Sequence, residues 1–123
     1  MVVCGDNETA SFDVLMRQDS FKNAIKNADI LVAPHHGRES AYHSDFVSLV
    51  NPRLTIISDT KKIEASASDK YTQISRGWNV ENPNGDISKR YCLTTRNDGN
   101  IRVEFGESDD IRYSRVLSVQ CFK

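Results

Sequence analysis

The sequence lacks any long hydrophobic run, and no stretch approaches the roughly 20 apolar residues that a transmembrane helix needs. Its opening segment, MVVCGDNETA, has neither the basic part nor the apolar part with which a secretory signal peptide begins. These absences predict a cytoplasmic protein that has no membrane anchor and no export signal.

Cysteine is scarce. The three cysteines, Cys4, Cys92 and Cys121, lie far apart and form no Cys-x-x-Cys pair. This spacing indicates neither a disulfide framework nor a zinc ribbon. We expect each thiol to behave as a small buried apolar group in a reducing compartment.

An excess of charge of one sign is also missing. The chain has 16 Lys and Arg residues against 17 Asp and Glu residues, which gives a formal net charge of −1. A nearly neutral chain is not one that holds nucleic acid by bulk charge alone.

Short apolar runs alternate with helical patterns along the 123 residues, which favours a single α/β domain. We expect a strand at residues 2–4 and buried strands at 30–33 and 54–57. Two helices, or one broken helix, are expected within 12–28, with further helices at 46–50 and 69–76. Towards the C-terminus, residues 91–95 and 101–105 flank the turn sequence RNDGN and predict a β-hairpin, and 111–119 predict a last strand.

All three histidines lie within nine positions of one another, at His35, His36 and His43. The first two directly follow the predicted strand 30–33, so they are expected at its carboxyl end, where open α/β sheets bind ligands. Gly37 then allows a ligand or another chain segment to approach the backbone closely. For His43 the pattern favours a helix cap over a metal ligand.

Asp6 follows the first predicted strand in the same way. Parallel pairing of neighbouring strands would place Asp6 and His35 at one edge of the sheet, and a carboxylate with an imidazole suits zinc, manganese or iron(II). Interpretations without a metal stay open: Gly5-Asp6 as a turn and helix cap, and the two histidines as edge residues bonded to main-chain carbonyls. Ser58 and Asp59 at the third strand end are expected to be caps.

Three segments together resemble the C-terminal half of a metallo-β-lactamase-fold hydrolase, most closely the bacterial ComEC-like competence branch. They are Gly5-Asp6 after a hydrophobic strand, DILVAPHHGRES at 29–40, and IISD at 56–59. The resemblance covers most of residues 2–105. It implies that residues 1–123 form a single domain that is half of an αββα sandwich, with a mixed sheet, flanking helices and a C-terminal β-hairpin.

The resemblance also implies roles for particular residues. Asp6, His35 and His36 would be ligands of a divalent metal, zinc or manganese, and Asp6 and His36 would act in catalysis. Proteins of this branch are implied to hydrolyse DNA phosphodiesters, with a metal-activated hydroxide that attacks in line.

The chain departs from the family pattern in two places. The family's N-terminal cluster His-x-His-x-Asp-His has no counterpart, because no histidine precedes His35. Where many members have Gly-His-Pro after the Ile-Ile-Ser strand, this chain has EASASD at 64–69. We therefore expect a metal-binding hydrolase fragment, a nuclease part that is inactive alone.

Such a fragment would expose an apolar sheet face, which a second copy or the missing N-terminal half would cover. Nucleic acid would be reached through the full-length site. The alternatives are a non-catalytic α/β binding or regulatory domain, and a half-site completed in trans by another chain.

Overall fold

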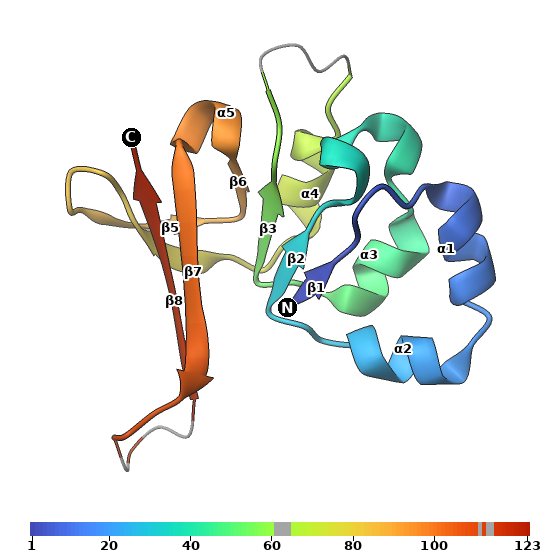
Figure 1. Cartoon of the computed structure of the whole chain (residues 1–123), viewed down its shortest axis with the longest axis horizontal. Coiled ribbons are helices and arrows are strands. Elements are labelled where there is room, and N and C mark those ends of the chain that lie inside the picture. Colours follow the sequence, from blue (N-terminus) through green and yellow to red (C-terminus); the bar gives the residue numbers. More distant parts are fainter. Residues whose placement is uncertain (61–64, 111, 113–114) are drawn as a thin grey trace.

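The computed structural model describes residues 1–60, 65–110, 112 and 115–123, and it consists of a helical layer and two β-sheets (Figure 1). The expected mixed α/β class is confirmed. In the part of the chain that is described, no helix is both long enough and apolar enough to cross a membrane. Part of the segment 64–69 and part of the expected last strand lie outside the described residues.

The first sheet is parallel and has the strand order β1-β2-β3-β6. Its strands are β1 (Val2–Val3), β2 (Ile30–Val32), β3 (Leu54–Ile57) and β6 (Cys92–Thr94). All four residues of β3 are buried, as expected for a strand covered on both faces. The strands predicted at 2–4, 30–33 and 54–57 are therefore confirmed, with ends that differ by at most one residue.

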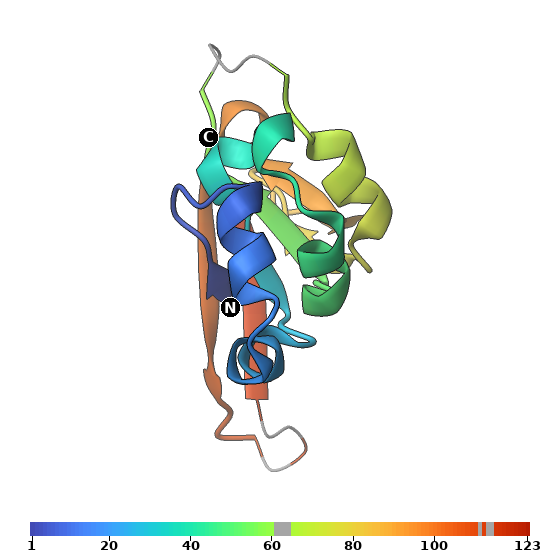
Figure 2. The same ribbon diagram turned by 90° about the vertical axis from the view of Figure 1, so that its right-hand side faces the viewer.

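Helices cover one face of this sheet (Figure 2). They are α1 (Thr9–Leu15), α2 (Asp19–Ile25), α3 (Ser44–Val50) and α4 (Ser68–Ile74), with the 3-10 helices η1 (Pro34–Gly37) and η2 (Glu39–Ala41) between β2 and α3. Phe12, Phe46 and Tyr71 from the helices pack with Leu31 and Ile57 of the sheet in one hydrophobic core. The helices predicted from the apolar periodicity are confirmed.

A second, mixed sheet in the order β5-β4-β8-β7 packs against the other face of the parallel sheet. Its strands are β4 (Trp78–Glu81), β5 (Ile87–Arg90), β7 (Asn100–Glu107) and β8 (Arg115–Phe122). Leu54, Leu93, Val80 and Val119 belong to the core between the two sheets. The chain therefore covers both faces of the parallel sheet itself, which differs from the expectation of an uncovered apolar face.

The prediction of a hairpin between residues 91–95 and 101–105 is wrong. Strand β6 lies beside β3, with Leu93 opposite Ile56, and β7 instead pairs antiparallel with β8 over its whole length. Between β6 and β7 the chain forms the short helix α5 (Thr95–Asp98), because the Thr94 hydroxyl accepts a hydrogen bond from the amide of Asn97 at 3.2 Å. The C-terminal hairpin exists, but its strands are β7 and β8.

Candidate functional site

The carboxyl ends of the parallel strands lie at one edge of the sheet, at the top in Figure 1, and we call this the carboxyl edge. The residues that follow β1, β2, β3 and β6 there are Gly5-Asp6, His35-His36, Ser58-Asp59 and Thr95-Arg96. The His35 amide donates to the Gly5 carbonyl at 2.8 Å, so the first two of these strand ends are in direct contact. The prediction that residues 5–6 and His35 share one edge is confirmed for the backbone.

Three consecutive residues at this edge adopt a left-handed backbone. His35 has φ 45° and ψ 51°, His36 has φ 58° and ψ 27°, and Gly37 has φ 69°. L-residues rarely adopt this conformation, and it persists only where the surrounding structure holds it. A Cβ atom at Gly37 would lie 2.8 Å from Cγ2 of Ile57, so the expected close approach is confirmed, and the approaching group is a side chain of β3.

His36 is fixed by a bond to the neighbouring strand end. Its Nδ1 atom lies 2.6 Å from the main-chain oxygen of Ser58. Because a carbonyl oxygen only accepts, Nδ1 carries the hydrogen, and Nε2 of the neutral ring keeps its lone pair. Histidines that bind metals are commonly oriented in this way, and the main-chain bond is also the interpretation that the sequence left open.

His35 has an equivalent arrangement with a carboxylate. Its Nδ1 atom lies 2.7 Å from Oε1 of Glu8, and 23% of its side chain is exposed. Donation from Nδ1 to Glu8 leaves Nε2 of the neutral ring with its lone pair. The two histidine rings have centroids 6.2 Å apart. Glu8 was not predicted from the sequence, because it is 27 positions from His35 and no local pattern signals this contact.

Asp6 is exposed, and in the described part of the chain it makes no hydrogen bond or ion pair. It is not a helix cap, because Glu8 occupies the N-cap position of α1. No group of three or more His, Cys, Asp or Glu side chains that could hold a metal ion occurs among residues 1–60, 65–110, 112 and 115–123. The carboxyl edge thus carries donors of the predicted kinds without a complete set of ligands.

Asp59 and Arg96 form an ion pair at the same edge. The Asp59 side chain is fully buried; its Oδ1 accepts from the Arg96 amide at 3.2 Å, and its Oδ2 lies 3.6 Å from Nη2 of Arg96 without a hydrogen bond. The Thr95 hydroxyl accepts from the Asp59 amide at 2.9 Å and donates to the Asp59 carbonyl at 2.8 Å. A buried carboxylate needs a cation, and Arg96 supplies one while 29% of its side chain stays exposed.

The sequence predicted Asp59 only as a cap, whereas its side chain accepts from the amide of the distant Arg96 and the N-cap of α5 is Thr94. The ion pair was missed because residues 92–94 were assigned to a hairpin. Had they been recognised as a parallel strand beside β3, Thr95-Arg96 would have been placed next to Ser58-Asp59.

His43 is a helix cap, as predicted. Its Nδ1 accepts from the Phe46 amide at 3.1 Å at the start of α3, and its Nε2 lies 2.9 Å from Oδ1 of Asp13. Both ring nitrogens are therefore engaged within the chain.

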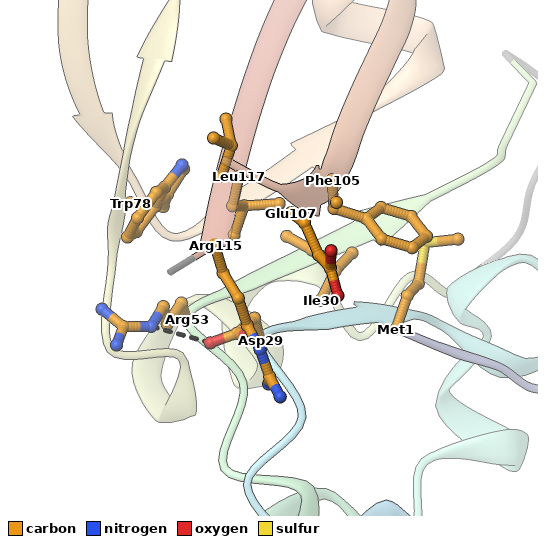
Figure 3. A pocket seen from close by; sticks show the side chains of 11 residues that line it. Met1, Asp29, Ile30, Arg53, Trp78, Phe105, Glu107, Arg115 and Leu117 are labelled. Carbon is orange, nitrogen blue, oxygen red and sulfur yellow. Dashed lines mark hydrogen bonds and ion pairs between the residues drawn. The ribbon is translucent and has the colours of Figure 1, made fainter. Parts of the chain in front are cut away.

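A groove of about 560 Å³ lies at the opposite end of the parallel sheet (Figure 3). Ile30 is the first residue of β2 there, and Asp29 and Arg53 directly precede β2 and β3. Arg53 donates to Asp29 at 2.9 Å, and its guanidinium lies 5.1 Å from the centre of the Trp78 ring. Figure 3 shows Phe105 pointing towards Met1 on the other side of the groove. No sequence pattern indicated this groove, and the length of the strands separates it from the histidines.

No protein-family model, curated protein or solved structure matches the chain.

Proposed function

We propose that this chain is the C-terminal part of a metal-dependent phosphodiesterase, a nuclease of the ComEC-like type with a metallo-β-lactamase fold, and that it is inactive alone. The observation that supports this best is the pair His35-His36. Each histidine is held in a left-handed conformation, and each Nδ1 has an acceptor. Such an arrangement leaves both imidazole Nε2 atoms available to a ligand.

The donors in this chain suit a metal in kind but not in number. Imidazole nitrogens and the exposed Asp6 carboxylate are ligands that zinc and manganese accept. A catalytic zinc takes about three protein ligands, and no such group occurs among the described residues. The remaining donors would come from the missing N-terminal half or from another chain, and this is why the fragment is proposed to be inactive.

Arg96 adds a cation that suits the proposed substrate. In the strand order β2-β3-β6, the ends that carry His36 and Arg96 are two strands apart, a separation of roughly 10 Å at about 4.8 Å per strand. A guanidinium recognises phosphate oxygens well, and Nη2 of this one lies 3.6 Å from Asp59 while 29% of the Arg96 side chain stays exposed. We propose that Arg96 binds a phosphate oxygen of a DNA strand at this edge.

Calorimetric titration of zinc and of manganese tests the metal site. The expected result is weak binding that is lost in His35→Ala, His36→Ala and Asp6→Asn but retained in His43→Asn, which changes the histidine that serves as a cap. Hydrolysis of a DNA oligonucleotide is expected only when the complementary N-terminal chain is added. Tight stoichiometric metal binding with hydrolysis by this chain alone would contradict the proposed inactivity.

A non-catalytic binding or regulatory domain is the second candidate function. It is favoured by the incomplete donor set and by the structural contacts that already occupy Nδ1 of both histidines. On this hypothesis, His35→Ala and Asp6→Ala leave partner binding unchanged, and neither metal binds the wild-type chain at any concentration tested.

A further inference from the structure

We infer that two copies of this chain pair edge to edge through β7, in an antiparallel β7–β7 contact that joins their mixed sheets. β7 is the last strand in the order β5-β4-β8-β7, so one of its two edges pairs with β8. No strand pairs with the other side among the described residues. β7 has eight residues, and an unpaired edge of this length is a template for another strand.

The side chains of β7 support an edge that is covered by a partner. Ile101 and Val103 pack against the core between the sheets but remain only partly buried, and 62% of Phe105 is exposed. Met1, which is 55% exposed, lines the same groove as Phe105 (Figure 3). Strand β1, which begins beside this groove, exposes 64% of Val3. Apolar side chains gathered in this way indicate a contact surface.

The sequence of β7 is complementary to itself. With a two-fold axis through Val103 and perpendicular to the sheet, Arg102 of each copy lies opposite Glu104 of the other copy. Ile101 lies opposite Phe105 in the same register. Cross-strand pairs of opposite charge and of apolar side chains stabilise a sheet, and an isologous contact makes each pair twice. The axis therefore passes between two favourable charge pairs.

The two nearest registers that keep the faces aligned are unfavourable. An axis through residue 102 places Arg102 opposite its own copy, and an axis through residue 104 does the same for Glu104, so like charges meet. Within one copy, Arg102 donates to Glu104, and their side chains are 62% and 56% exposed. Charged side chains on an edge strand disfavour pairing with unrelated strands. A second copy of β7 instead places a charge of opposite sign opposite each of them.

Charge reversal tests the contact, with the molar mass measured by light scattering and sedimentation from low to high micromolar concentrations. The wild-type chain is expected to be in equilibrium between monomer and dimer. Arg102→Glu and Glu104→Arg should each weaken the dimer by roughly tenfold or more, because each creates two pairs of like charges. An equimolar mixture of the two variants should form a heterodimer, and the double variant should dimerise again. Arg17→Glu is the control, since it makes the same charge change away from β7.

Three results would overturn this inference. They are a wild-type chain that is monomeric at every concentration, a dimer that Arg102→Glu does not weaken, and single variants that do not recover on mixing. In the first case, the edge is left for a strand of another polypeptide. Amide exchange of the wild-type chain gives a second measurement that needs no variant: protection of residues 100–106 should rise with protein concentration, and protection that does not change contradicts the contact.

Discussion

The Nδ1 atom of His36 lies 2.6 Å from the main-chain oxygen of Ser58, and this bond joins the end of β2 to the end of β3. The next residue, Asp59, is held in turn by Thr95 and Arg96 at the end of β6. The carboxyl edge is therefore a continuous series of contacts between strand ends. Substitutions at this edge, and in the core beneath it, are expected to change the stability of the protein by measurable amounts.

Gly37→Ala should destabilise the protein by about 2–4 kcal/mol. A left-handed backbone costs a residue with a Cβ roughly 1–2 kcal/mol, and the overlap with Ile57 adds about as much again. Gly5→Ala is the matched control, because Gly5 has φ 57° but no atom lies within 4 Å of the position that an alanine Cβ would take there. Urea denaturation measures both free energies of unfolding, and equal losses would contradict the contact with Ile57.

His43→Ala should lower the free energy of unfolding by about 1–2 kcal/mol, since it removes the side-chain acceptor for the Phe46 amide at the start of α3. His43→Asn keeps an acceptor at the N-cap and should lose less. Thermal denaturation of the two variants gives the comparison. A loss in the asparagine variant as large as that in the alanine variant would show that the cap is not what stabilises this helix.

Stability should fall as the pH rises above about 9. Burial raises the pKa of the Cys4 thiol from 9.0 to about 12, and burial does the same for Cys92. Between pH 9 and about pH 12, each thiol has lost its proton in the unfolded chain but keeps it in the folded chain. In this range each thiol therefore lowers the free energy of unfolding by up to roughly 1.4 kcal/mol per pH unit. Below pH 9 both states keep the proton and this effect is absent.

Urea denaturation from pH 7 to pH 11 measures that decline, and Cys4→Ala should make it less steep. A stability that stays level above pH 9, or a wild-type slope in the Cys4→Ala variant, would count against buried protonated thiols. The thiol reagent DTNB should also label Cys4 and Cys92 slowly in the folded protein and rapidly after unfolding.

Arg96→Met should destabilise the protein by roughly 3 kcal/mol, because it leaves the buried Asp59 carboxylate without its cation. The double variant with Asp59→Asn should lose less than the sum of the two single losses. Lys22→Met, which breaks an exposed ion pair with Asp19, is the control and should change stability by less than about 0.5 kcal/mol. Additive losses in the double variant would show that Asp59 and Arg96 do not interact.

Features that depend on neighbouring residues could be predicted from the sequence. The apolar run at 30–33 and the run at 54–57 indicated buried strands, and the cap by His43 followed from a polar residue ahead of an apolar helix. Placing His35 near Gly5-Asp6 needed only the rule that parallel strands end at one edge, and the amide of His35 does contact the Gly5 carbonyl. The metal and the nuclease activity remain predictions.

The sequence by itself determined the α/β class, the order of strands and helices up to α4, and the position of the histidines after β2, because each depends on a local pattern of apolar and polar residues. Only the tertiary structure decided that β6 pairs with β3, that Glu8 holds His35 and that Arg96 neutralises Asp59. These contacts join residues from 27 to 37 positions apart. Local patterns give a segment its shape and its buried face, whereas which distant segment covers that face is set by the packing of the whole chain.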